Sequence, residues 1–173
     1  MANSPRRVYW DACAWIALIQ REKIAVGGSD RDTLCRAVIS EAKKNKIEIL
    51  TSTLSLVEVC KNSKVRTSDD DQIGAYFEND YILLMNVDRL VGEHARKLMI
   101  EGHTALKPPD AIHIASAVLG NASEFHTFDG GGEKKGLLDL DQKIDRLDGG
   151  KLRICIPDVG GTPPPLLSGM QKP

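Results

Sequence analysis

The stretch Val8-Tyr9-Trp10-Asp11 is a short run of β-forming residues that ends at an acid, and residues 12–18 continue it as a helix. A second apolar run, residues 47–51, is again followed by a short helix, and that helix contains Glu58. Further strand-like runs lie at residues 81–85, 125–128 and 152–156. Strands that alternate with helices predict an α/β domain with a mostly parallel central sheet and helices on both of its faces.

Capping residues predict where the helices between these strands begin. Asp88 precedes an amphipathic segment and is expected to cap it. Thr53 or Ser55 is expected to cap the short helix after the second strand, with Glu58 in its first turns. Pro108 is tolerated in the first turn of a later helix, whose apolar stripe follows directly.

Length and composition limit the class of protein. The 173 residues fit one domain, and 42% hydrophobic with 27% charged residues is ordinary for a globular protein. No apolar run is long enough for a membrane helix, and the N-terminal residues lack a signal-like apolar core. The four cysteines stand singly, without the spacing of a zinc site, and are expected to be buried, reduced thiols. We therefore expect a cytoplasmic protein without a membrane partner.

Four acids stand where the predicted topology would bring them together. Asp11 and Asp129 end predicted strands, and Glu58 and Asp110 lie in helices that start at the same edge of the sheet. Ligands of such sheets bind at the carboxyl ends of the strands. Clustered carboxylates repel one another unless a cation neutralises them, and their oxygen atoms suit Mg²⁺ or Mn²⁺. Such metal ions act on phosphodiesters, and they would give a chain of net charge −1 an attraction for phosphate.

Each acid also has an ordinary structural interpretation. Asp110 is placed to cap its helix, and Asp129 before three glycines suits a turn. Asp11 is the strongest candidate, because no capping need is evident at the end of the first strand. All four acids at one predicted edge favour a functional site over coincidence.

The motifs around these acids resemble those of the PIN-domain ribonucleases, and most closely the VapC-type toxins of toxin–antitoxin pairs. The matching segments are Val8-Tyr9-Trp10-Asp11, Thr51-Ser52-Thr53-Leu54-Ser55-Leu56-Val57-Glu58, Pro109-Asp110-Ala111-Ile112-His113-Ile114-Ala115-Ser116-Ala117 and Thr127-Phe128-Asp129. The third segment is the most specific. The chain differs from the compact toxins in a glycine-containing loop at residues 19–31 and in a proline-rich tail.

The resemblance implies a Rossmann-like three-layer α/β/α fold and cleavage of single-stranded RNA by metal-activated water. It maps the catalytic, metal-binding acids onto Asp11, Glu58, Asp110 and Asp129. It further implies that Thr53 or Ser55 near Glu58, and Thr127 beside Asp129, hold a carboxylate or a coordinated water. Lys61, Lys64 and Arg66 are the expected RNA contacts, because they follow Glu58 directly.

Partners and domain limits follow from the same resemblance. An antitoxin protein and a second copy of the chain are expected partners. Residues 1–156 are expected to form the nuclease domain, and the Pro- and Gly-rich residues 157–173 a flexible tail.

Three other functions were weighed against the nuclease. A dehalogenase-like phosphatase needs a second Asp at position 13, where this chain has Cys13, and a receiver domain needs adjacent acids at the first strand end. A non-catalytic PIN-like module that binds RNA or protein stays open, and metal binding would separate it from an enzyme.

Overall fold

A computed structural model describes residues 4–60, 72–102 and 106–160 of the chain. Within these residues, five strands form one sheet in the spatial order β5-β4-β1-β6-β7. In that order the strands are Ile82–Met85, Ile47–Ser52, Arg6–Trp10, Glu124–His126 and Arg153–Cys155. Every neighbouring pair is parallel. The predicted α/β class is confirmed, and the described sheet is wholly rather than mostly parallel.

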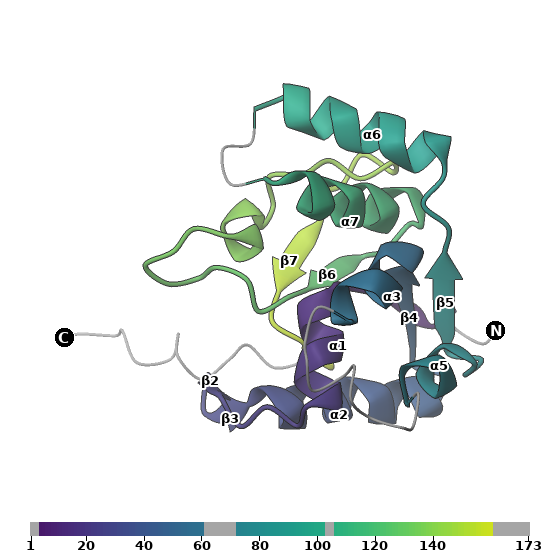
Figure 1. Cartoon of the computed structure of the whole chain (residues 1–173), viewed down its shortest axis with the longest axis vertical. Helices are drawn as coiled ribbons and strands as arrows, with labels where there is room; N and C mark the ends of the chain where they lie inside the picture. Colours follow the sequence, from purple (N-terminus) through teal and green to yellow (C-terminus); the bar gives the residue numbers. More distant parts are fainter. Residues whose placement is uncertain (1–3, 61–71, 103–105, 161–173) are drawn as a thin grey trace.

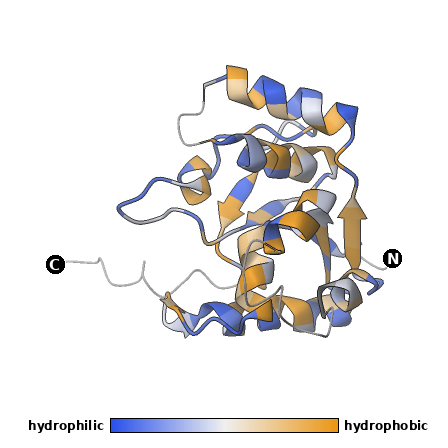
Figure 2. Ribbon diagram, in the orientation of Figure 1, coloured by the Kyte–Doolittle hydropathy of each residue, from blue (hydrophilic) through white to orange (hydrophobic). Residues whose placement is uncertain are grey.

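Helices cover both faces of the sheet, so the predicted three layers are confirmed (Figure 1). Helices α6 (Arg89–Ile100) and α7 (Pro108–Leu119) pack on one face, and α1 (Ala12–Ile19) and α2 (Arg31–Lys43) on the other. Helices α2 and α6 carry many hydrophilic residues, whereas α1 is largely hydrophobic (Figure 2). Among the described helices, none combines the length and apolarity needed to cross a bilayer.

The alternation of side chains along β1 divides the core in two. Val8 and Trp10 point into the layer of α1 and α2, and Tyr9 points into the layer of α6 and α7. All three are fully buried. Because β1 is the central strand, the residue that follows it emerges at the middle of the sheet edge.

The short helix after β4 begins differently from the sequence prediction. Helix α3 spans Thr53–Val59, and its N-cap is Ser52 rather than Thr53 or Ser55. Glu58 is therefore the second-to-last residue of α3 and not in its first turns. The reason is that β4 continues to Ser52, so the strand passes straight into the helix without an intervening capping loop. By contrast, Asp88 caps α6 as predicted, since its side chain accepts from Val91 N.

Smaller elements complete the described chain. A two-stranded hairpin, β2 (Ala25–Val26) and β3 (Ser29–Asp30), occupies the segment predicted as a glycine-containing loop. Helix α5 is Gln72–Phe77, and the 3₁₀-helix η1 is Leu137–Leu140. The loop between β6 and η1 projects from the body of the molecule (Figure 1).

The last described residues, 157–160, are attached to the sheet. The backbone carbonyl of Asp158 accepts from Arg6 Nη2 at 2.9 Å, and its carboxylate pairs with Arg153 at 3.3 Å. Asp158 thus connects the segment after β7 to β1 and β7, and the domain boundary at residue 156 stays a prediction. Residues 161–173 of the predicted tail lie outside the described residues.

Candidate active site

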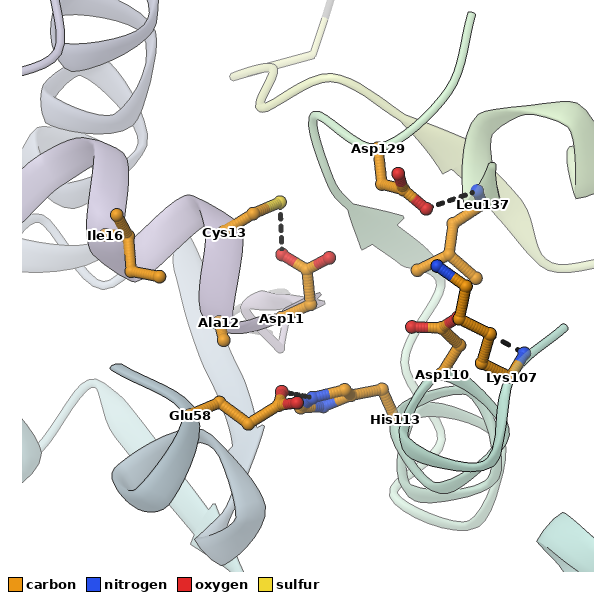
Figure 3. Close-up of a pocket in the computed structure, with 10 residues that line it drawn as sticks. All are labelled: Asp11, Ala12, Cys13, Ile16, Glu58, Lys107, Asp110, His113, Asp129 and Leu137. Atoms are coloured by element: carbon orange, nitrogen blue, oxygen red, sulfur yellow. Dashed lines mark hydrogen bonds and ion pairs between the residues drawn. The ribbon is translucent and has the colours of Figure 1, made fainter. Parts of the chain in front are cut away.

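A pocket of about 310 Å³ opens at the carboxyl end of the sheet, between α1, α3 and the start of α7 (Figure 3). The register of the sheet pairs Trp10 with His126, so the residues that follow β1 and β6 emerge side by side. The residues that line the pocket are Asp11, Ala12, Cys13, Ile16, Glu58, Lys107, Asp110, His113, Asp129 and Leu137. All four acids that the sequence singled out therefore lie around one pocket.

Asp11 is fixed from three sides. Its Oδ1 accepts from the Ala14 N–H at 3.2 Å and from the Cys13 thiol at 2.8 Å, and its Oδ2 accepts from the Thr127 hydroxyl at 2.6 Å. The bond to Ala14 makes Asp11 the N-cap of α1, so the expectation of no capping need at this point was wrong. Burial raises the pKa of Asp11, although nearby His113 and the two side-chain donors partly oppose the rise.

Asp110 lies in the first turn of α7. Its Oδ2 accepts from the backbone N–H of Lys107 at 3.3 Å, so the capping role considered for it exists as well. Partial burial raises the pKa of Asp110, and the charge of Asp129 across the pocket adds to the rise. The charge of Asp129 thus disfavours the ionisation of Asp110.

Asp129 reaches the pocket from an irregular segment. Strand β6 ends at His126, whereas the sequence predicted a strand up to residue 128. The backbone N–H groups of Phe128 and Asp129 bond to the side chains of Cys13 and Thr127 and not to a neighbouring strand. Asp129 Oδ2 accepts from Leu137 N at 3.1 Å across the base of the following loop. The acid therefore closes a turn and borders the pocket at the same time.

Glu58 enters from the end of α3 and meets His113 of α7. Its Oε2 lies 2.7 Å from His113 Nε2, and the other ring nitrogen, Nδ1, lies 2.8 Å from the hydroxyl of Tyr9. The sequence analysis did not place His113 in the site. A signal was available, since His113 stands one helical turn after Asp110 and so on the same face.

Thr127 connects two of the acids. Besides donating to Asp11, its hydroxyl accepts from the backbone N–H of Asp129 at 3.0 Å. The Thr53 hydroxyl accepts from Val87 N, and the Ser55 hydroxyl bonds to the Thr51 hydroxyl. These two contacts anchor the start of α3. A role of these two residues in holding Glu58 stays a prediction.

Cys13 and Lys107 line the pocket although the sequence analysis gave neither a site role. Burial and the neighbouring Asp11 raise the pKa of the Cys13 thiol well above its usual value, so it stays protonated and donates to that carboxylate. Lys107 is exposed and contributes a positively charged side chain to the pocket lining. The predicted RNA contacts Lys61, Lys64 and Arg66 lie outside the described residues.

Of the four cysteines, all free, Cys35 is buried, Cys13 and Cys155 are half-buried and Cys60 is exposed, so the expectation that all four are buried was wrong.

A second group of potential metal ligands lies away from the pocket, at Glu124, His126 and Cys155. Within the described residues, this is the one group that places three such atoms within 4.8 Å of one another. Both nitrogens of His126 are engaged, one with the Trp10 indole at 3.2 Å and one with Glu124 at 3.1 Å. The carboxylate of Glu124 also pairs with two arginines, Arg6 and Arg153. These guanidinium groups repel a cation and already neutralise Glu124. The three residues are therefore part of an ion-paired network and not a favourable metal site.

The pocket acids fit a divalent cation by their chemistry. Carboxylate oxygens are the ligands that hard cations prefer, and burial raises the pKa values of Asp11 and Asp110, so a bound cation would favour their ionised forms. Unlike the Glu124 group, no three of these described acids place ligand atoms within 4.8 Å of one another. Glu58, Asp11, Asp110 and Asp129 are the residues that would hold the cation.

Comparison with known proteins gives a family and a fold. The model of the PIN domain matches residues 8–136. Among solved structures, the Mycobacterium tuberculosis VapC20 toxin, described as cleaving the sarcin–ricin loop, aligns with a TM-score of 0.53 and 16% identity over 72% of this chain and 91% of that one. A toxin–antitoxin complex from Klebsiella pneumoniae gives 0.49 and 19%, over 69% and 84%. No curated protein sequence matches the chain significantly.

Proposed function

Because this chain belongs to the PIN-domain family, we propose that it is an endoribonuclease that cleaves single-stranded RNA with the aid of Mg²⁺ or Mn²⁺. The observation that carries the proposal is the gathering of Asp11, Glu58, Asp110 and Asp129 around one pocket. These acids come from four separate segments of the chain. Structural roles explain why some of them cap a helix or close a turn, but not why all four lie around one pocket. A site without function would not need all four to face the same opening.

The pocket residues divide the tasks of phosphodiester hydrolysis between them. The four carboxylates hold the cation, which when bound neutralises phosphate charge and lowers the pKa of water. Thr127 and Cys13 hold Asp11 in place by donating hydrogen bonds to its two oxygens. Lys107, exposed at the pocket lining, supplies a positive charge for a phosphate of the RNA strand.

The partners of the protein form part of the same proposal. An antitoxin that covers the acidic pocket, a second copy of the chain, and a cytoplasmic location all fit a VapC-like toxin. Single-stranded RNA is the proposed substrate, and Lys61, Lys64 and Arg66 remain the proposed contacts beyond the described residues. Residues 1–156 are the proposed catalytic unit.

Cleavage of a mixed single-stranded RNA by the purified protein tests the function. We expect cleavage with Mn²⁺ or Mg²⁺, none with EDTA, and none by Asp11→Asn or Asp110→Asn. The asparagine at position 11 still accepts from Ala14 N as a helix cap, so Asp11→Asn is expected to stay folded. A variant with full activity, free of contaminating nuclease, would contradict the assignment. No cleavage under any condition, together with no Mn²⁺ binding, would favour the non-catalytic module.

A further inference from the structure

Glu58 is the pocket acid that contacts a histidine of another helix. Asp11, Asp110 and Asp129 each accept a hydrogen bond from a backbone N–H. Glu58 accepts one from a side chain, the imidazole of His113, which comes from a different helix 55 residues later. A glutamate has three rotatable bonds, and restricting them costs conformational entropy. The firmness with which His113 is held therefore contributes to the orientation of Glu58 toward the pocket.

His113 is held firmly. It is 2% exposed, and its neighbours on α7, such as Ala111 and Ile114, are fully buried. Its second nitrogen lies 2.8 Å from the hydroxyl of Tyr9, on the central strand β1. The Tyr9 ring in turn stacks on Phe125 of β6, with centroids 5.1 Å apart. The chain of contacts Tyr9–His113–Glu58 therefore links the rigid centre of the sheet to the pocket.

The two hydrogen bonds also fix where the imidazole carries its proton. An ionised carboxylate only accepts, so Nε2 of His113 must carry a hydrogen and donate it to Glu58. When the ring is neutral, Nδ1 is then an acceptor for the buried Tyr9 hydroxyl, which lies 2.8 Å away. With both nitrogens engaged, His113 is not free to bind a metal ion itself.

We propose that His113 is a positioning residue that holds the Glu58 carboxylate ready for a divalent cation, and that Tyr9 selects the tautomer needed for this. The proposal rests on the proposed function, because it assumes that Glu58 is a metal ligand. Partners that orient metal-binding side chains in this way typically contribute about 10–100-fold to metal affinity. The alternative is a structural tie between α3 and α7 that has no effect on the metal.

A pair of substitutions at one position separates the two roles. In His113→Gln the side-chain amide nitrogen lies near the place of Nε2 and still donates to Glu58, whereas His113→Leu keeps the volume but removes the donor. We expect His113→Leu to weaken Mn²⁺ binding by about 10–100-fold in titration calorimetry, and His113→Gln to restore most of the affinity. His94→Leu serves as the matched control, because it replaces a histidine of α6 that does not line the pocket.

Tyr9→Phe tests the second half of the proposal and keeps the stacked ring. In the wild-type protein, ¹⁵N NMR should show His113 with the proton on Nε2, and Tyr9→Phe should yield a mixture of tautomers with weaker Mn²⁺ binding. If a folded His113→Leu variant binds Mn²⁺ as tightly as the wild-type protein, the inference about His113 is overturned but the proposed function is not. Equal loss of Mn²⁺ affinity in His113→Leu and His113→Gln would show that the donor to Glu58 does not set the affinity, and this result would overturn the positioning role. No Mn²⁺ binding by the wild-type protein would overturn the proposed function and this inference with it.

Discussion

The hydroxyl of Thr127 illustrates how single residues combine structure with the proposed function. It donates to Asp11 at 2.6 Å and accepts from the backbone of Asp129 at 3.0 Å, so one side chain sets the relative position of two pocket acids. Asp11 itself is an N-cap and a pocket acid at once. At these positions the structural and the functional interpretations of a residue do not exclude each other.

The residue Glu124 carries a prediction about pH. Burial alone would raise its pKa, but His126 and the guanidinium groups of Arg6 and Arg153 outweigh burial and lower the pKa to about 2. A lowered folded-state pKa adds stability above the unfolded value near 4.5, and this stability is lost as the pH falls toward 2. Glu124→Gln should therefore reduce the free energy of unfolding at pH 7 by on the order of 3 kcal/mol.

Denaturant unfolding of both proteins across pH 7 to 3 measures this effect. The difference between wild type and Glu124→Gln should begin to shrink below about pH 4.5, where the unfolded carboxyl takes up its proton. A difference that stays constant with pH would show that the network stabilises the fold by packing rather than by charge.

Among the elements, the loop between β6 and η1 is built on a close contact of two glycines. A Cβ on Gly136 would lie 2.6 Å from both Asp129 Oδ2 and the backbone nitrogen of Gly130. Gly130 has φ +96°, a conformation that side chains disfavour. The base of the loop thus fixes the backbone of Asp129, while residues 131–135 are exposed.

Gly136→Ala should therefore displace Asp129 and lower the cleavage rate on the order of 10²-fold, since small displacements of reactive groups have effects of that size. Gly132→Ala is the matched control in the same loop, because its Cβ would meet nothing within 4 Å and its φ is unstrained. RNA cleavage and thermal melting of both variants give the measurement. Equal rates for the two variants would show that Asp129 does not need this tight base.

The order and type of the main elements could be predicted from the sequence, because strand composition and helix periodicity are local signals. The exact ends of α3 and β6 could not. Ser52 continues its strand because it pairs with Met85 of β5, and β6 ends early because the backbone N–H of Phe128 bonds to Cys13 of α1. Both reasons are tertiary contacts that a local pattern does not contain.

For the whole molecule, the sequence predicted which acids would meet but not what holds them. The Asp11, Asp110 and Asp129 motifs stand out locally, whereas the contact of Glu58 with His113 joins segments 55 residues apart. The balanced net charge of −1 likewise gave no sign of RNA binding. Affinity for RNA would have to come from the metal and from local cations such as Lys107.

The central claim is that Asp11, Glu58, Asp110 and Asp129 together hold the divalent cation. Crystals of the protein soaked in Mn²⁺ test it most directly, because the anomalous scattering of Mn²⁺ locates the ion without assumptions about activity. We expect an anomalous peak in the pocket, in contact with carboxylate oxygens, and its loss in Asp11→Asn. A peak only at Glu124, His126 and Cys155, or none at the pocket in saturating Mn²⁺, would contradict it.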